Sequence, residues 1–314
     1  MESSNLKNKM NDPFNLTTPV LFLVFNRLDT AKKVFSEIKK AKPKQLFIAS
    51  DGPRKNKEGE KEAVEKVRKH ILNQIDWKCN VKTLFRKKNL GCKNAVSSAI
   101  DWFFENVEQG IILEDDCLPD SSFFRFCQEL LIKYKDNNEV TQISAQNYLP
   151  GLVLNNSYTF SKYPMLWGWA TWGRAWRGIY NKEKFKIETQ SSNSYLKEVF
   201  PKYIERKFFE KRFLDSLSNK VDTWEFPWVF GQIRNRRLTI LPNKNLVVNE
   251  GISLFSTNTK ENKMDEYFLK IKRNKIIFPL KHPKKVKLNY LIAPMWLLRD
   301  ALRVILKKFF KIIF

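Results

Sequence analysis

The sequence is poor in cysteine and lacks the glycine patterns that hold phosphate groups. Its four cysteines in 314 residues form no CxxC pair, which excludes a disulfide scaffold and favours a reducing compartment. Neither GxGxxG nor GxxxxGK(S/T) occurs, which argues against dinucleotide-binding and P-loop proteins. No apolar run with a small-residue cleavage site follows the N-terminus, so we expect no signal peptide and a cytoplasmic location. The cysteines are Cys79, Cys92, Cys117 and Cys127.

Negative charge is scarce as well. The 57 Lys and Arg outnumber the 33 Asp and Glu, and the formal net charge is +24. Hydrophobic residues make up 43% of the chain, which excludes a disordered acidic protein because enough apolar surface is available to build a core. The excess is greatest from Gly251 to the end, where 15 Lys and Arg face 4 Asp and Glu. This balance indicates an anionic partner: a nucleic acid, a membrane or an anionic small substrate.

The last 20 residues favour a membrane. On a helical projection of about 100° per residue, five cations fall on one half and eight apolar side chains on the other. The longest uncharged run nearby, Leu288 to Leu298, has 11 residues, short of the ~20 that span a bilayer. We therefore expect a basic amphipathic C-terminal helix that lies on the inner face of the membrane and binds its anionic surface. The alternative is a helix packed on the protein's own core. The cations are Arg299, Arg303, Lys307, Lys308 and Lys311, and the apolar residues are Met295, Leu298, Leu302, Ile305, Leu306, Phe309, Ile312 and Ile313.

Short apolar runs alternate with helical patterns in the first half of the chain. The runs predict strands at residues 20–25, 45–50, 81–85 and 110–116, with helices at 29–40, 57–73 and 93–106 between them. The runs at 20–25 and 45–50 have the continuous apolar character of buried strands. This order predicts an α/β fold with a mostly parallel central sheet flanked by helices. Ligands bind beyond the carboxyl ends of such strands. The polar groups placed there are Asn26 and Arg27, Asp51, Arg86 with Asn89, Leu90 and Gly91, and Glu114 to Asp116.

Three consecutive acids, Glu114, Asp115 and Asp116, follow the last of these apolar runs. In an extended segment, Glu114 and Asp116 face one way and Asp115 the other. Like charges this close raise one another's pKa unless a cation or a hydrogen-bond donor neutralises them. A hard divalent ion would do so and could carry a substrate diphosphate on its open positions. The alternative is an exposed acidic turn before the helix that begins near Ser121.

An ordered set of motifs resembles a known family. The set is VLFLVFNR, SDGP, RKKNLGC, ILEDDCLPDSSFF, WGWATWGRAW, DTWEFPW and ILPNKNLVVNEG, and it spans residues 18–259. It resembles the GT-A nucleotide-diphospho-sugar transferases, and especially bacterial relatives of the N-acetylglucosaminyltransferase I family. The resemblance implies a Rossmann-like GT-A domain over residues 19–260, with a nucleotide-sugar half at 19–120 and an acceptor half at 121–260. A loose lead at 1–18 and a basic, amphipathic extension at 261–314 would flank it.

The resemblance also implies roles for the strand-end residues. Asp116 would bind the metal, Mn²⁺ or Mg²⁺, while Glu114 and Asp115 would face the nucleoside. Arg27 would lie against the nucleotide, and Asp51 would contact its base. The remaining expected donor-binding residues are Phe25, Arg86, Gly91 and Lys93. From their location in the sequence, Arg86 and Lys93 would add positive charge near the diphosphate.

The same resemblance places the acceptor chemistry in the second half of the chain. Glu225 is the expected general base, with Asp222 in reserve, because aromatic neighbours would desolvate a carboxylate and raise its pKa. The alternative is that Glu225 is an ordinary surface acid. Trp167, Trp169 and Trp224 either contact the acceptor sugar by stacking or pack in the core.

We therefore expect a metal-dependent, inverting glycosyltransferase. Its donor would be a nucleotide-diphospho-sugar, with UDP-GlcNAc or another UDP-sugar as the first candidate. Its acceptor would be a hydroxyl of a lipid-linked or cell-surface glycan. Two alternatives stay open: a catalytically degenerate membrane-associated scaffold with the same fold, and a basic nucleic-acid-binding protein. The acids at the strand ends argue against the latter, since a nucleic-acid groove needs cations.

Overall fold

A computed structural model describes residues 14–147, 155–190, 193–251 and 271–290. The amphipathic helix expected at 295–314 and most of the lead at 1–18 lie outside the described residues. No helix within the described ranges is both long and apolar enough to span a bilayer.

The first half of the chain folds as the alternation predicts. Each expected strand and helix is present, with boundaries that differ by three residues or fewer. The elements are β1 (Val20–Val24), α2 (Leu28–Ala41), β2 (Gln45–Ser50), α3 (Glu60–Asn73), β3 (Asn80–Phe85), α4 (Gly91–Asn106) and β4 (Gln109–Glu114). All four strands are parallel, and β1 lies between β2 and β4, with Val20 opposite Leu46 and Ile111.

The second half continues the same sheet. The eight strands stand in the order β3-β2-β1-β4-β8-β6-β9-β7, and β5 and β10 form a separate antiparallel pair. The pairs β4–β8, β6–β8 and β7–β9 are antiparallel, whereas β6–β9 is parallel. The elements are β5 (Cys117–Pro119), α5 (Ser122–Lys133), β6 (Val140–Ser144), β7 (Tyr158–Ser161), β8 (Trp169–Trp172), α6 (Gly173–Ile179), α7 (Lys182–Gln190), α8 (Asn193–Val199), α9 (Tyr203–Leu217), α10 (Glu225–Arg234), β9 (Leu238–Pro242) and β10 (Val247–Asn249).

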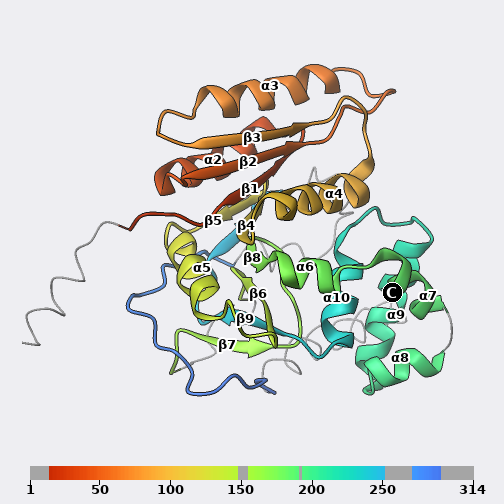
Figure 1. The fold of residues 1–314 in the computed structure, drawn as a ribbon. Helices are drawn as coiled ribbons and strands as arrows, with labels where there is room; N and C mark the ends of the chain where they lie inside the picture. The colour runs from red at the N-terminus through yellow and green to blue at the C-terminus, as the bar shows by residue number, and fades with distance from the viewer. Residues whose placement is uncertain (1–13, 148–154, 191–192, 252–270, 291–314) are drawn as a thin grey trace, which may run out of the picture.

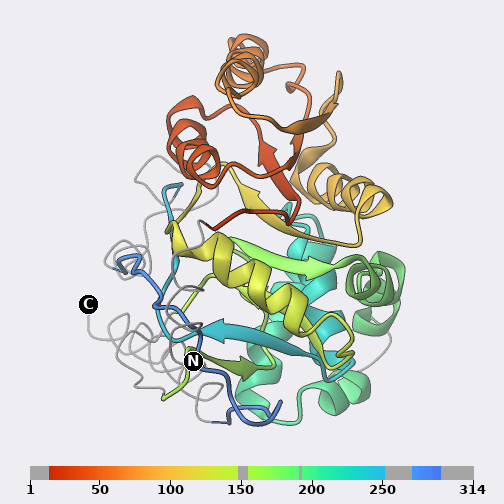
Figure 2. The same cartoon turned by 60° about the vertical axis from the view of Figure 1, so that its left-hand side comes forward.

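Helices cover both faces of this sheet (Figures 1 and 2). In Figure 2, α2 and α3 lie on one face of β1 to β3 and α4 lies on the other. Around the middle strands, α5 lies in front and α10 behind, while α7, α8 and α9 form a helical group at the side in Figure 1. The structure therefore confirms an α/β fold with a large, mostly parallel central sheet flanked by helices.

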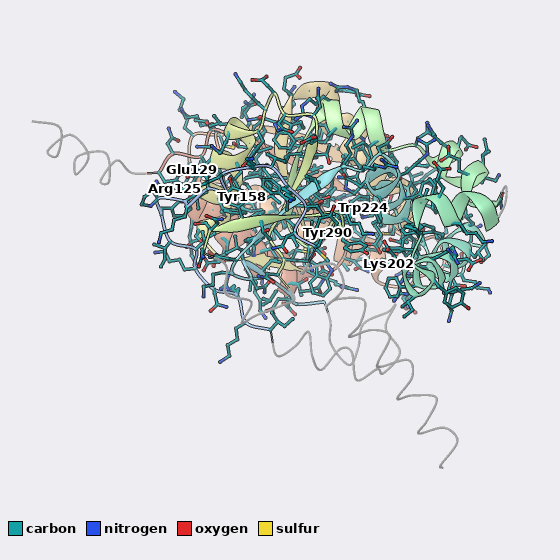
Figure 3. The ribbon with its side chains drawn as sticks, turned by 90° about the horizontal axis from the view of Figure 1, so that it is seen from below. Arg125, Glu129, Tyr158, Lys202, Trp224 and Tyr290 are labelled. Atoms are coloured by element: carbon teal, nitrogen blue, oxygen red, sulfur yellow. The ribbon has the colours of Figure 1, made fainter. Side chains whose placement is uncertain are left out.

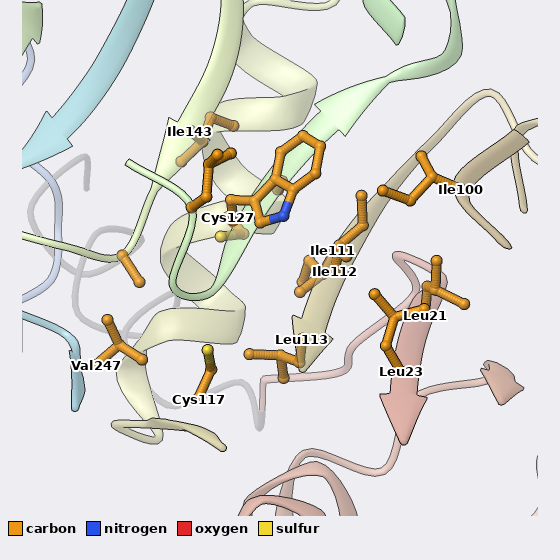
Figure 4. Packing of buried hydrophobic residues seen from close by; sticks show 14 of the residues in the cluster. Leu21, Leu23, Ile100, Ile111, Ile112, Leu113, Cys117, Cys127, Ile143 and Val247 are labelled. Carbon is orange, nitrogen blue, oxygen red and sulfur yellow. The ribbon is translucent and has the colours of Figure 1, made fainter. Parts of the chain in front are cut away.

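The core forms where β1 and β4 meet α5, β6 and β10. Figure 4 shows the aliphatic side chains of these elements packed against one another, with the thiols of Cys117 and Cys127 among them. The strands are continuously apolar because helices bury both of their faces. The two buried cysteines occupy the positions of small hydrophobic side chains.

One strand boundary changes the geometry of the acids. β4 ends at Glu114, and Asp115 and Asp116 form a turn before β5. The expectation that Asp116 faces the same way as Glu114 assumed an extended segment through residue 116, and that assumption is wrong. The turn lies where the chain leaves the parallel sheet for the separate β5–β10 pair, which alternation along one strand cannot describe.

Packing at Gly110 provides a test of the core. A Cβ atom there would collide with the Phe103 ring and approach the Pro19 carbonyl oxygen to 3.1 Å. We expect Gly110→Ala to lower the free energy of unfolding by about 1–3 kcal/mol, since added volume in a packed core forces neighbours to shift. Gly178→Ala is the matched control, because no atom lies within 4 Å of its added Cβ. Urea denaturation of both variants measures the difference, and equal stabilities would contradict the packing described here.

Candidate active site

The predicted donor-binding residues meet where the strand order of the sheet reverses. From β1 the chain moves outward through β2 and β3, then returns to β4 on the other side of β1. Ligands of open α/β sheets bind outside the carboxyl ends of the strands at such a point. Here the Phe25 backbone N–H, just after β1, donates to Asp115 Oδ2 at 2.9 Å. Arg27 Nη1 lies 3.4 Å from Asp116 Oδ2, so the two strand ends are joined by two polar contacts.

Burial and the charges of neighbouring acids raise the pKa values of Glu114 and Asp115. Burial, followed by the charge of Asp116, raises the pKa of Asp115 to about 7, although the Phe25 amide and Arg27 oppose the shift. Burial also raises the pKa of Glu114, and the charges of Asp116, Glu225 and Asp115 raise it further. A hydrogen bond with the Trp224 side chain acts in the opposite direction. The cluster is therefore short of positive charge, which favours binding of a cation.

The residues fit a divalent ion only together with a phosphate-bearing ligand. Among the described residues, no three His, Cys, Asp or Glu side chains are grouped as a metal site. Asp116 is partly exposed, with one oxygen near Arg27 and the other accepting a hydrogen bond from Cys117 Sγ at 3.3 Å. Mg²⁺ and similar ions are commonly held by one or two carboxylates plus substrate phosphates and water. One partly exposed carboxylate is therefore enough, provided that a diphosphate supplies further oxygens.

The turn after β10 packs directly on this cluster. The Glu250 backbone N–H donates to the Asp116 carbonyl oxygen at 2.7 Å. A Cβ atom on Gly251 would lie 2.7 Å from Arg27 Nη1 and closer still to Asp116 Oδ2. Glycine is therefore needed at position 251 for the chain to approach the acid. Glu250 and Gly251, at the end of the ILPNKNLVVNEG motif, make these contacts. In the sequence, this motif served only as part of the family resemblance.

Asp51, at the end of β2, holds the loop that precedes α4. Its carboxylate accepts hydrogen bonds from the backbone N–H groups of Gly52 (2.9 Å), Leu90 (3.0 Å) and Gly91 (3.1 Å). The Asn89 side-chain amide donates to it at 2.9 Å. Burial raises the pKa of Asp51 despite these donors. Its contact with a nucleobase remains a prediction. In the structure, the Asp51 carboxylate holds the loop before α4 in place through these hydrogen bonds.

Arg86 and Lys93 lie on either side of the same loop. Arg86 Nη2 donates to Ser98 Oγ at 2.8 Å, and the guanidinium interacts with the charge of Asp51. Lys93 takes part in no ion pair within the described ranges, and its backbone N–H donates to Asp222 Oδ1 at 3.0 Å. Their expected interaction with a diphosphate remains untested.

Asp222 caps α4 from the other half of the chain. Leu90, the residue before the helix, contributes no capping side chain. Instead, Asp222 Oδ2 accepts from the Cys92 backbone N–H at 2.7 Å while its Oδ1 accepts from Lys93. A Cβ atom on Gly91 would lie 2.8 Å from Asp222 Oδ2, and Gly91 has φ +76°, a conformation that favours glycine. Both oxygens of the reserve base candidate are therefore engaged with helix amides.

Glu225, the first residue of α10, interacts electrostatically with Glu114 of the acid cluster. Burial raises the pKa of Glu225, while a hydrogen bond with the Thr223 side chain and the charge of Arg212 lower it. The negative charge of Glu225 contributes to the raised pKa values of Glu114 and of the Cys92 thiol. The structure thus brings Glu225 to the strand-end acids, 109 residues further along the chain than Asp116.

The three tryptophans predicted to contact the acceptor are placed differently from one another. Trp169 and Trp224 are 1% and 3% exposed, and their rings stack at a centroid distance of 5.6 Å. Both side chains therefore pack in the core, which the sequence had left open as the alternative to stacking on an acceptor sugar. Trp167 is partly buried, and its backbone N–H donates to Gln146 Oε1 at 2.7 Å. Contact with a sugar remains a prediction for all three.

Two buried charged residues that organise the site were missed by sequence reasoning. Glu60 accepts hydrogen bonds from Asn26 Nδ2 (2.9 Å) and the Arg54 backbone (2.8 Å), which joins the loops after β1 and β2. Arg68 donates to the backbone oxygens of Asp51 (2.9 Å) and Arg86 (2.8 Å), at the ends of β2 and β3. Arg68 could have been found, because it stands on the buried face of a helix otherwise lined by Val64, Val67 and Ile71.

No protein-family model and no curated protein matches the chain. Among solved structures, the chain is similar to a mannosyltransferase from Pyrobaculum calidifontis in complex with GDP-mannose and Mn²⁺ (11% identity, 74% of this chain and 75% of that one, TM-score 0.39). It is also similar to 4-diphosphocytidyl-2C-methyl-D-erythritol synthase from Anaerococcus prevotii (7% identity, 81% and 97%, TM-score 0.33). A third similar structure is the inositol-1-phosphate CTP transferase from T. maritima (13% identity, 84% and 99%, TM-score 0.31). Likeness at this level assigns no activity to the chain.

The cap on α4 gives a direct test of the site's construction. We expect Asp222→Ala to lower the free energy of unfolding by about 0.5–2 kcal/mol, the usual effect of losing a helix cap. Asp222→Asn should lose less, because an amide oxygen can still accept one of the two hydrogen bonds. Chemical denaturation measures both. Equal losses for the two variants would show that the charge of Asp222, rather than its capping oxygens, stabilises the fold.

Proposed function

We propose that this protein is a metal-dependent, inverting glycosyltransferase that uses a nucleotide-diphospho-sugar. UDP-GlcNAc or another UDP-sugar is the first candidate for the donor. The acceptor is proposed to be a hydroxyl of a lipid-linked or cell-surface glycan at the cytoplasmic face of a membrane. The acceptor and the location are supported by the basic, apolar C-terminal sequence, and the donor by the motifs of the first half.

The observation that carries the proposal is the meeting of carboxylates from two distant parts of the chain. Asp115 and Asp116 lie at the strand-order reversal, and Glu225 reaches the same cluster from α10. A structural role alone does not explain this arrangement, because unneutralised acids at close range repel one another. A cation carrying a diphosphate would neutralise it.

Each group has a chemical task in such a reaction. Asp116 would hold the ion and Arg27 would contact the diphosphate, so that both oppose the charge that develops on the leaving group. The bound ion supplies a Lewis acid to the diphosphate oxygens. Glu225 would take the proton from the acceptor hydroxyl as that oxygen attacks the anomeric carbon. A single displacement of this kind inverts the configuration of the sugar.

Asp116 is the residue to change first to test the donor site. We expect Asp116→Asn to abolish Mn²⁺-dependent binding of a nucleoside diphosphate, because the neutral amide is a weaker ligand than a carboxylate. Calorimetric titration with UDP, dTDP, GDP and CMP, each with and without Mn²⁺, measures this and identifies the base. Asp136→Asn, at a side chain 88% exposed in another part of the molecule, is the matched control. Unchanged metal dependence in Asp116→Asn would remove Asp116 from the metal site.

Glu225→Gln tests the general base. We expect turnover to fall by roughly 10²–10⁴-fold with donor binding unchanged, since only proton transfer is lost. Because the base must be ionised and burial raises the pKa of Glu225 above 4.5, wild-type turnover should rise with pH through a value above 4.5. This rise should be missing from the residual activity of Glu225→Gln. Full turnover of the variant in a sugar-transfer assay would return the role to Asp222.

A further inference from the structure

Residues 271–290 form a basic segment that we call the C-terminal strap. The strap contains seven Lys and Arg and no Asp or Glu. In Figure 1 it runs from beside α5 down to the lower end of the molecule. Its cations are Lys272, Arg273, Lys275, Lys281, Lys284, Lys285 and Lys287.

The strap is fixed to the fold by its own backbone. The Asn274 N–H donates to the Asn245 carbonyl oxygen at 2.7 Å, and the Ile276 N–H donates to Ser122 Oγ at 3.0 Å. Further along, Lys281 and Ser157 exchange two hydrogen bonds of 2.8 Å, of which one runs to the Lys281 carbonyl oxygen and one from its N–H. The strap is therefore a defined surface of the domain rather than a loose tail.

The last part of the strap covers the edge of the sheet. Leu288 forms a parallel bridge with Phe160 of β7, and the Asn289 N–H donates to the Phe160 carbonyl oxygen at 2.9 Å. His282 Nδ1 lies 2.9 Å from the hydroxyl of Tyr158, a buried residue of the same edge strand. Figure 3, a view from below, labels Tyr158 on β7 and Tyr290 at the end of the strap.

Most of the strap's cations have no acidic partner. Arg273 lies 3.6 Å from Glu37, but the six lysines take part in no ion pair within the described ranges. Glu129 on α5, whose charge acts on His282 of the strap, is already bonded to Arg125 at 2.7 Å. All six lysines are exposed. The strap thus presents fixed, uncompensated positive charge to the solvent.

Two large apolar side chains of the strap are also exposed. Ile277 is 80% exposed and Tyr290 is 69% exposed, whereas Ile276 and Leu280 of the same segment are buried. Aliphatic and aromatic side chains beside lysines are typical of surfaces that lie in a lipid headgroup region. A nucleic-acid backbone would gain little from an exposed isoleucine, because phosphate contacts are polar.

We infer that the C-terminal strap is a docking surface for an anionic lipid membrane. Its lysines would lie at the headgroups, and Ile277 and Tyr290 would enter the interface between them. The inference shares the membrane location with the proposed function but not its chemistry, since it concerns the edge of β7 and not the acid cluster.

Vesicle binding by the full chain tests this inference. We expect binding to phosphatidylglycerol-containing vesicles, weak binding to pure phosphatidylcholine, and loss of most binding at high salt. A variant with Gln at Lys281, Lys284, Lys285 and Lys287 should bind anionic vesicles several hundredfold more weakly, at roughly fivefold per lysine. These four substitutions leave the backbone hydrogen bonds of the strap in place.

The matched control removes the same charge from two helices outside the strap. Lys32, Lys61, Lys66 and Lys69, on α2 and α3, are exposed and would be changed to Gln together. Retained vesicle binding by this control, with loss in the strap variant, supports the inference. Equal loss in both variants would show a general effect of net charge and would overturn the inference. Vesicle binding by the strap variant at wild-type strength would also overturn it.

A second variant tests the apolar side chains and the competing partner. Ile277→Ser combined with Tyr290→Ser should weaken the residual vesicle binding that remains at high salt, where charge is screened. Circular dichroism confirms that each variant is folded. If the lysine variant loses affinity for duplex DNA or RNA while its vesicle binding is unchanged, the strap serves nucleic acid and the inference is wrong.

Discussion

Repulsion among carboxylates at the end of β4 is the constraint on which the site depends. Glu114, Asp115 and Asp116 would oppose folding if they remained charged without partners, and Glu225 adds a fourth acid. Part of this negative charge is compensated, because the Phe25 backbone N–H donates to Asp115 and the Arg27 guanidinium lies near Asp116. Neither fully compensates, since the pKa of Asp115 stays raised to about 7. A cation bound at this position would relieve the remaining repulsion.

Charged side chains replace glycine-rich loops in holding the strand ends. Asp51 binds the backbone of the loop before α4, and Glu60 and Arg68 tie together the ends of β1, β2 and β3. Asp222 adds the N-terminus of α4 to this network from 130 residues away. The loops are therefore ordered before any ligand arrives, which lowers the entropic cost of binding it.

The C-terminal strap covers part of an exposed edge of the sheet. β7 is an edge strand, and an uncovered edge can pair with other chains. The strap occupies part of that edge through Leu288 and Asn289 and turns its lysines outward. Protection of the edge and presentation of positive charge thus come from the same twenty residues. The position of this surface depends on contacts with Ser122 and Ser157, both more than 120 residues earlier in the chain.

By itself, the sequence determined the first four strands, the helices between them and the polar groups at their carboxyl ends. It could do so because apolar runs and helical periodicity are local signals, and because parallel strands bring their carboxyl ends to one edge. Only the tertiary structure decided that Asp116 lies in a turn, that Asp222 caps α4 and that Trp169 and Trp224 stack in the core. These outcomes depend on contacts between residues far apart in the chain, and no pattern within a short window contains them.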